Sequence, residues 1–427
     1  MYLFEAGKKA LRNFDNETAI LHLTHGLTLL KELPETHSRN QQELDFQLAL
    51  GVPLVLVRGH GTFEVEATYT RALQLCQQIG DTPQLFQVLM GLRRFYLHQG
   101  DLLAARQTGE QMISLAINQQ DQFALSRAWM MQEEVMYAMG EFTQACECCQ
   151  QGRKLYDPQQ ASVHVLVYGN DTGIGLRMFC ILVKWILGFP EQARAEAKRL
   201  VNRAVELRHP FSLVCALYWT ALLYQLLGDI ATVQEKAEEV FKISVERNFV
   251  LYRASALVLK GWVCSEQGRQ DDGIALIQQG IAGQQAPGAA FIRMSELSIL
   301  AEAFRKAGKI QNALAVLADA DQAVVETQQR GWMAENLRIK GELLLLHDSK
   351  DTRQAEDCFQ QALVIARDQQ AKSWELRAAL SLSRLWQQQD RMADAHHLLK
   401  GVYETFTEGF DTADLIEARG LLEQLQL

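Results

Sequence analysis

Apolar residues recur along this chain with the three-to-four-residue spacing of amphipathic helices, and short motifs ending in glycine interrupt them at regular distances. Sustained alternation of apolar and polar residues, which would predict β-strands, is nearly absent. The same spacing continues without a glycine at Asp348 (or Lys350) and Asp390, and it extends back to about Gly61 and Phe14. The chain therefore contains about ten repeat units. The glycine marks, at intervals of 40, 48, 40, 40 and 40 residues, are Gly100, Gly140, Gly188, Gly228, Gly268 and Gly308.

Each unit reads as a helical hairpin. A small residue commonly stands five positions after the mark, and an aromatic residue stands four positions before several marks. A glycine supplies the left-handed turn, and a small side chain early in the second helix lets the two backbones approach. The small or substituted positions are Ala19, Ala105, Ala145, Ala193, Val233, Gly273, Ala313 and Ala395, and the aromatic ones are Tyr96, Tyr224, Phe304 and Trp386.

A period near 40 lies between the 34-residue tetratricopeptide unit and the longer HEAT and armadillo units. The order of aromatic residue, turn and small residue is the tetratricopeptide pattern with each helix lengthened by about one turn. The chain has seven prolines, which argues against kinked HEAT-like helices. We therefore predict an all-α, tetratricopeptide-like right-handed superhelical solenoid of about ten helical hairpins with a C-terminal capping helix.

Two features divide this solenoid. We expect residues 1–410 to form the repeats, with a longer loop at 157–173 separating N-terminal and C-terminal halves. Residues 411–427 are expected to form the capping helix, with Asp411 as its N-cap and Asp414 in its first turn. Residues 2–13 already read as the first helix of a hairpin, so we expect other sequence or a partner to cover them.

Composition excludes several classes of protein. The net charge is −9, 48% of the residues are hydrophobic and 22% are charged, which is typical of a packed globular chain rather than a disordered one. No block of Lys and Arg is present, and nucleic acids and anionic membranes both require clustered positive charge. We expect neither as a partner.

Cysteine usage and the apolar runs suggest a soluble protein of the cytoplasm. The eight cysteines stand mostly singly within apolar helical patterns, where a thiol acts as a small hydrophobe. Residues 1–11 carry Glu5, Lys8 and Lys9 where a signal peptide would be apolar. The longest apolar run, 178–187, is shorter than the ~20 residues that span a bilayer.

The sequence offers no catalytic motif. Gly7-Lys8 and Gly308-Lys309 lack the rest of a phosphate-binding loop, and residues 168–175 read better as a loop and helix N-cap. Cys146 and Cys149 share a helical face but have no second pair with which to complete a zinc site. We therefore predict no enzymatic activity, no cofactor and no metal site.

A binding surface is the remaining possibility. In a superhelix of such hairpins the first helices line the concave side, and the register of the turns predicts which side chains face it. Partly exposed Met and aromatic side chains are the usual anchors of a peptide or helix ligand. The predicted groove residues are Arg94, Arg127, Met130, Glu134, Tyr137, Met178, Trp185, Tyr218, Trp262, Arg305, Arg338, Arg377 and Arg384.

Two interpretations of these residues compete with a peptide groove. The Met and aromatic side chains could instead pack against neighbouring repeats. Alternatively, the chain is a small-molecule effector sensor with a pocket inside the solenoid near 157–173. An open groove with exposed aromatic residues would favour a protein or peptide partner, and a closed pocket with convergent polar groups would favour an effector.

Several stretches also resemble a known family, the C-terminal tetratricopeptide-like region of bacterial signalling proteins. These proteins carry a class III nucleotide cyclase or protein kinase domain and an AAA/STAND-type ATPase domain in front of it. The resemblance implies a regulatory arm that binds a ligand or partner, with such an ATPase or cyclase module as a further partner, in cis or in trans. It rests on residues 19–30, 155–160, 209–213, 340–345, 355–362, 371–379, 385–389 and 407–415.

Overall fold

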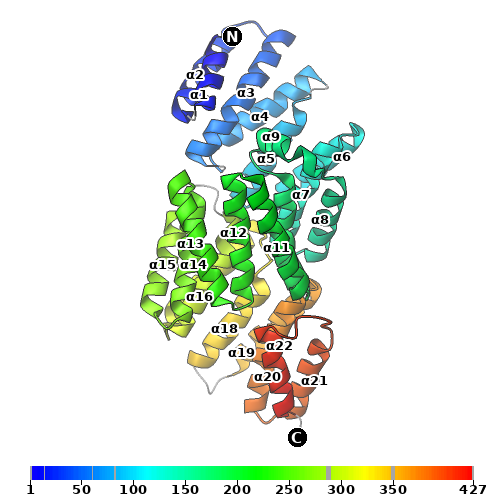
Figure 1. Cartoon of the computed structure of the whole chain (residues 1–427), viewed down its shortest axis with the longest axis vertical. Helices are drawn as coiled ribbons and strands as arrows, with labels where there is room; N and C mark the ends of the chain where they lie inside the picture. Colours follow the sequence, from blue (N-terminus) through cyan, green and yellow to red (C-terminus); the bar gives the residue numbers. More distant parts are fainter. Residues whose placement is uncertain are drawn as a thin grey trace. The chain divides into compact units, whose positions relative to one another are not determined.

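The computed structural model describes residues 2–13, 15–59, 61–80, 83–284, 290–347 and 352–425. Within these ranges the chain forms 22 α-helices and one short 3-10 helix, with no β-strand (Figure 1). The turn positions expected at Phe14, Asp348 and Lys350 lie outside the described residues. The prediction of an all-α, tetratricopeptide-like helical-repeat fold is confirmed.

By its internal contacts the chain divides into two compact units. Unit 1 comprises Met1–Val135 with Ala286–Phe291, and unit 2 comprises Met136–Gln285 with Ile292–Leu427. The helices of unit 1 are α1 (Tyr2–Arg12), α2 (Asn16–Lys31), α3 (His37–Arg58), α4 (Phe63–Ile79), α5 (Leu85–Gln99), α6 (Leu102–Asn118) and most of α7 (Gln122–Met139).

Unit 2 contains the remaining helices, and α10 to α21 pair in order as six hairpins among the described residues. They are α8 (Phe142–Leu155), α9 (Ala161–Tyr168), α10 (Thr172–Ile186), α11 (Pro190–Leu207), α12 (Pro210–Leu226), α13 (Ile230–Arg247), α14 (Val250–Glu266), α15 (Gln270–Gly283), α16 (Ala290–Lys306), α17 (Ile310–Thr327), α18 (Met333–His347), α19 (Arg353–Asp368), α20 (Lys372–Gln388), α21 (Met392–Tyr403) and α22 (Ala413–Leu425).

The hairpin turns form as the glycine marks predict. All six glycines, from Gly100 to Gly308, have φ between 70° and 90°, a conformation that residues with a side chain rarely adopt. Asp390, the position without a glycine, takes the same left-handed turn with φ 58°. Two or three residues between paired helices therefore suffice to reverse the direction of the chain.

Close contact between paired helices depends on the small residues that follow the turns. Ala105, Ala193 and Ala313 are completely buried. At Gly273 a Cβ atom would lie 2.6 Å from the carbonyl oxygen of Gly261, so α14 and α15 approach more closely than any side chain would allow. The small positions thus set the distance between the two helices of a hairpin.

Residues 157–173 differ from the expected long loop because most of them are helical. Asp157 accepts a hydrogen bond from the backbone N–H of Gln159 and starts the 3-10 helix η1 (Pro158–Gln160), which leads into α9. Asp171 then caps α10 by accepting from the backbone N–H of Gly173, as the N-cap interpretation predicted. The division by internal contacts falls after Val135; a functional separation at 157–173 remains a proposal.

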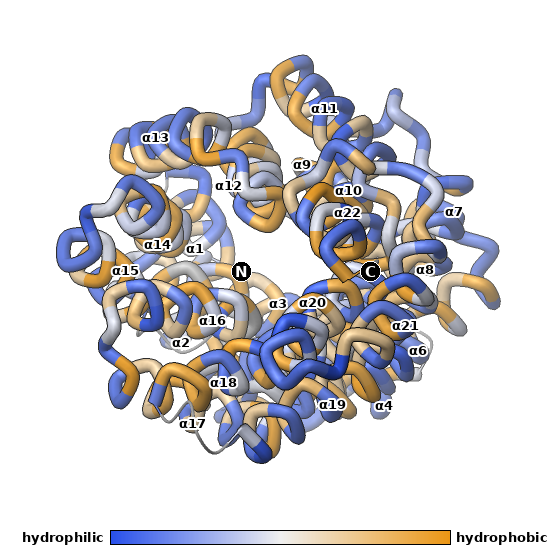
Figure 2. Tube along the Cα trace, turned by 90° about the horizontal axis from the view of Figure 1, so that it is seen from below, coloured by the Kyte–Doolittle hydropathy of each residue, from blue (hydrophilic) through white to orange (hydrophobic). Residues whose placement is uncertain are grey.

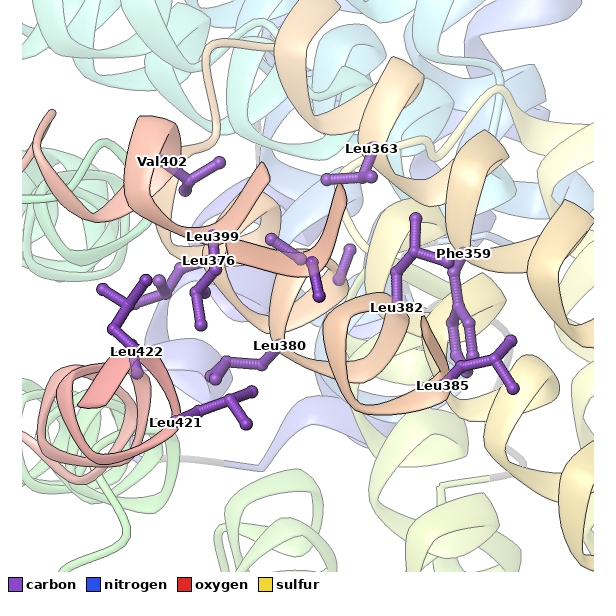
Figure 3. Close-up of a cluster of buried hydrophobic side chains, with 14 of the residues drawn as sticks. Phe359, Leu363, Leu376, Leu380, Leu382, Leu385, Leu399, Val402, Leu421 and Leu422 are labelled. Carbon is purple, nitrogen blue, oxygen red and sulfur yellow. The ribbon is translucent and has the colours of Figure 1, made fainter. Parts of the chain in front are cut away.

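The C-terminal helix α22 covers an apolar face of the last hairpin. Leu421 and Leu422 pack in one buried cluster with Leu376 and Leu380 of α20 (Figure 3), and Leu415 belongs to the same cluster. The helix begins at Ala413, so Asp411 is not its N-cap; the Asp411 carboxylate instead lies 2.8 Å from Nη1 of Arg194. Asp414 does stand in the first turn.

Unit 2 closes on itself. Contacts join residues about five repeats apart: the rings of Trp185 and Trp374 lie 4.8 Å apart, and the Gly409 amide donates to the Glu191 carboxylate at 3.0 Å. Figure 2 shows α10, α20 and α22 next to one another. The hairpins from α10 to α22 therefore form a closed turn in which the last repeat packs on the first. Among the described residues, no helix is both long and apolar enough to cross a bilayer.

Candidate functional site

The predicted groove residues fall into two groups in the structure, and unit 1 holds the first. Arg127 is completely buried and Met130 nearly so, while Arg94 and Glu134 are half-buried. Nη1 of Arg127 lies 3.4 Å from the Met130 sulfur. Glu134 pairs with Arg93, a buried residue that the sequence analysis did not select.

Of the adjacent residues Arg93 and Arg94, Arg93 makes the buried ion pair between helices. Its guanidinium donates to the Glu134 carboxylate and to the backbone carbonyl of Met131, and burial lowers its pKa. The sequence register placed Arg94 on the concave side, one residue away. A buried ion pair of this kind holds α5 against α7, because either charge alone would be costly to bury.

The Met and aromatic residues of unit 2 are buried. Met178, Trp185, Tyr218 and Trp262 are each less than 8% exposed, as is Tyr137. These side chains therefore form part of the packing between repeats. A ligand could contact them only if the repeats around them moved apart.

Their contacts show what they hold together. The Tyr137 hydroxyl accepts a hydrogen bond from Nε1 of Trp332 at 3.3 Å, across 195 residues of sequence, and burial raises its pKa. Trp185 packs edge-on to Trp374, and the Arg377 guanidinium lies 4.9 Å from the Trp185 ring centre. This aromatic contact is the apolar part of the ring closure in unit 2.

The second group consists of charges on α16, α18, α20 and α22 that the structure brings together. Arginines and carboxylates alternate in this set: Arg338 pairs with two carboxylates of its own helix, whereas Arg305 and Arg377 connect neighbouring helices. We name this set the charge ladder; it comprises Glu302, Arg305, Glu335, Arg338, Glu342, Arg377 and Asp414.

Arg338 is the centre of the charge ladder. Its Nε lies 2.8 Å from Glu335 and its Nη1 lies 2.5 Å from Glu342, both on α18. Arg305 of α16 also reaches Glu342, at 3.3 Å. Arg377 of α20 lies 3.2 Å from Glu335, so the pairs continue across the helices without a gap.

Arg377 joins the ladder to the closure of unit 2. Its Nε lies 2.9 Å from Asp414 of α22, and its Nη2 donates to the backbone carbonyl of Leu226 at 2.6 Å. The predicted residue Arg384 lies about two helical turns further along α20 and pairs with Glu417, where both side chains are well exposed. Of the predicted arginines in unit 2, Arg305, Arg338 and Arg377 thus belong to one network.

The pKa of Glu335 reflects this network. Burial would raise it, but the positive charges and hydrogen bonds of Arg338 and Arg377 lower it to about 2. The pKa of the Glu342 carboxyl is lowered in the same way: burial would raise it, but the charges of Arg338 and Arg305 lower it. Glu335 and Glu342 are therefore ionised at neutral pH.

A buried polar cluster lies on the neighbouring helices and was missed by the sequence analysis. The Gln284 amide, at the end of α15, donates to Ser255 at 3.0 Å and to Oε1 of Glu296 at 2.7 Å. Burial raises the pKa of Glu296 to about 7, and the hydrogen bonds from Gln284 and Ser255 and the charge of Arg293 lower it only in part. Oε2 of Glu296 has no hydrogen-bond partner among the described residues.

The cysteines and histidines form neither a disulfide nor a metal-binding group among the described residues. None of the eight cysteines, all of which lie in the described residues, forms a disulfide, and Cys148 and Cys149 are buried on α8. Within the described part of the chain, no three His, Cys, Asp or Glu side chains are grouped so as to hold a metal ion.

The fold and this site define the class: a tetratricopeptide-like helical-repeat protein whose last repeats carry an ordered row of charges. No protein-family model matches the sequence, and no curated protein matches it. Among solved structures, the chain is similar to a Rap protein complexed with competence and sporulation factor, with 12% identity, a TM-score of 0.48 and coverage of 100% of this chain and 99% of that one. It is also similar to yeast Tom70, with 14% identity, a TM-score of 0.38 and coverage of 100% and 95%.

Proposed function

We propose that this chain is a non-catalytic interaction scaffold that binds a protein or peptide along the charge ladder of unit 2. The observation that carries the proposal is a row of fixed charges on four successive helix layers, whose side chains are 7–25% exposed. Guanidinium and carboxylate groups held in place by one another lose little freedom when a ligand arrives. A peptide with alternating charges can therefore bind at low entropic cost.

Selectivity would come from the pattern of charges rather than from buried aromatic anchors. Like charges brought together by a wrong partner cost several kcal/mol, whereas correct pairing fixes the register of the ligand. The buried residues Met178, Trp185, Tyr218 and Trp262 would then support the groove from behind. In unit 1, the half-buried Arg94 and Glu134 form a second candidate contact for a ligand, whereas Arg127 and Met130 are buried.

A comparison of retained proteins tests this proposal. The wild-type chain and the variant Arg305→Gln are each immobilised, and bound proteins are identified by mass spectrometry. The matched control is Lys309→Gln, which removes an exposed ion pair with Asp271 just beyond the end of α16. A partner retained by wild type and control but lost from Arg305→Gln supports the ladder as the site. Identical sets from all three proteins would contradict it.

We further propose that the scaffold acts as the sensor arm of a signalling ATPase or nucleotide cyclase in the cytoplasm. This step rests on the resemblance of the sequence stretches described above. Co-expression with such a module, followed by co-purification, measures the association directly. A chain that never co-purifies with any ATPase or cyclase module would remove this part and leave the scaffold proposal intact.

A second candidate function is a small-molecule effector sensor, and the cluster around Glu296 favours it. A carboxyl with one unpartnered, buried oxygen can accept a hydrogen bond from a ligand. Thermal-shift screening of polar small molecules against wild type and Glu296→Gln tests it. A ligand that stabilises wild type far more than the variant would identify this cluster as an effector site.

A further inference from the structure

Three arginines converge on one carboxylate at the start of unit 2, away from the charge ladder. Glu196 of α11 is 1% exposed. Its carboxylate lies 3.1 Å from Nη1 of Arg153 on α8 and 3.2 Å from Nη1 of Arg199 on α11, and it also pairs with Arg177 on α10. The helix α10 packs against both α8 and α11, and Figure 2 shows α10 beside α11.

The charges in this cluster do not balance. One carboxylate can compensate one guanidinium, so three arginines and Glu196 leave an excess of two positive charges. Among the described residues, none of the three arginines has an ion pair with any carboxylate other than Glu196. This excess stands out in a chain whose net charge is −9.

The charge ladder has no such excess of positive charge, so the excess is a feature of the group around Glu196. There, three arginines face four carboxylates, and each arginine touches at least two of them. At Glu196 the ratio is reversed, and the arginines repel one another. Burial lowers the pKa of Arg177, and the charges of Arg153 and Arg199 lower it further.

The neighbouring Cys180 thiol is affected by the same positive charges. The pKa of Cys180 falls to about 7, first because of a hydrogen bond with Cys149 and then, against burial, because of Lys184, Arg153 and Arg177. Even when the Cys180 thiol is ionised, the cluster keeps a positive charge, since Lys184 adds to the excess.

We propose that Arg153, Arg177 and Arg199 form a binding site for a phosphoryl group. A phosphate dianion supplies the two negative charges that the cluster lacks, whereas a carboxylate supplies one. Guanidinium groups present planar forks of N–H donors that match phosphate oxygens. Glu196 positions the forks from the buried side.

The arginine side chains reach solvent, whereas Glu196 is buried. The Arg199 side chain is 66% exposed, Arg153 is 34% exposed and Arg177 is 24% exposed. A phosphoryl group can therefore approach the three side chains from solvent. Two sources share this chemistry: free inorganic phosphate and a small organic phosphomonoester.

Isothermal titration of the full chain with inorganic phosphate, in chloride at constant ionic strength, tests the proposal. Arg199→Ala and Arg153→Ala should each weaken binding at least tenfold, because each removes charged hydrogen bonds to the anion. The matched control is Arg194→Ala, on the same helix, which has one partner, Asp411. Circular dichroism checks that all variants fold.

Each outcome decides something. Saturable binding to wild type and Arg194→Ala that is lost in Arg199→Ala supports the site. A parallel titration with phenyl phosphate identifies the source: tighter binding than inorganic phosphate indicates an organic phosphomonoester, and weaker binding indicates free phosphate. If wild type shows no saturable binding to either compound, or if Arg194→Ala loses as much affinity as Arg199→Ala, the proposal is overturned.

Discussion

Two glutamates on neighbouring hairpins of unit 2 are buried to a similar extent and yet have opposite properties. Glu296 on α16 is 1% exposed and Glu335 on α18 is 6% exposed. Glu296 is surrounded by neutral amide and hydroxyl groups, and its pKa rises to about 7, whereas two guanidiniums hold the pKa of Glu335 at about 2. Burial therefore does not decide the charge of a carboxyl; its partners do.

The two regions differ in how much each depends on its charges. The charge ladder is a network in which every carboxylate has a cation, so the removal of one cation leaves other charges buried and unpaired. The polar cluster around Glu296 contains one ionisable carboxyl that is most stable when neutral. Four predictions follow from this contrast, ordered from the largest expected effect.

Replacement of Arg338 by Ala should cause the largest loss. Glu335 and Glu342 would then lie close together with part of their compensation gone, and we expect the free energy of unfolding to fall by about 3–5 kcal/mol. Urea denaturation measures the loss. Lys340→Ala, on the same helix with an exposed partner, Asp321, should cost less than about 1 kcal/mol and serves as the control. Equal losses in both variants would mean that the ladder has no special role in stability.

Replacement of Glu335 by Gln should make acid stability diverge from that of the wild type. The folded pKa of about 2 lies below the ordinary value of 4.5, so the stabilisation by ionised Glu335 is complete above pH 4.5 and disappears as the pH falls through about 2. The difference in the free energy of unfolding between wild type and variant should approach about 3 kcal/mol near neutral pH. Denaturation at a series of pH values tests this; a difference that does not change with pH would contradict it.

Replacement of Glu296 by Gln should have the opposite dependence on pH. The folded pKa of about 7 lies above 4.5, so the contribution of Glu296 to stability is complete below pH 4.5 and is lost as the pH rises through about 7. At alkaline pH we expect the variant to be more stable than the wild type by about 2–3 kcal/mol, and near pH 4.5 the two should be similar. Melting temperatures at acidic and alkaline pH measure the effect. A variant that is less stable than the wild type at every pH would show that a neighbouring group stabilises the ionised form of Glu296, and would contradict the prediction.

Replacement of Arg384 by Gln should have the smallest effect. This arginine pairs with Glu417 where the two side chains are 49% and 40% exposed, and such pairs contribute about 0–1 kcal/mol. The change in urea midpoint should be close to the error of the measurement. A loss comparable to that of Arg338→Ala would extend the ladder to this pair.

The repeat pattern predicted most of the fold because the interactions that define a hairpin are local. The turn at Gly228 and the buried Val233 that follows it lie within a few residues of each other, so their spacing is visible in the sequence. The expected loop at 157–173 was predicted less well. An aspartate cap and a short apolar stretch were enough to form η1 and α9, and a repeat period carries no information about an insertion.

The candidate site was predicted in part. The register selected Arg305, Arg338 and Arg377, and the structure joins these three residues in one ion-pair network, because equivalent positions of successive repeats align. It also selected Trp185, whose exposure depends on Trp374, a residue nearly 190 positions away. Glu296 and the group around Glu196 gave no signal, since a single Glu or Arg in a helix looks the same whether it is solvated or buried.

The sequence by itself therefore determined the helices, their pairing into hairpins and the order in which the hairpins stack, because each depends on residues close together in the chain. The tertiary structure decided the state of the individual charges and the burial of the aromatic residues. Both depend on contacts between different helices, some in neighbouring hairpins and some across the closure of unit 2, and electrostatic energy depends on the distance between groups in space rather than on their separation along the chain.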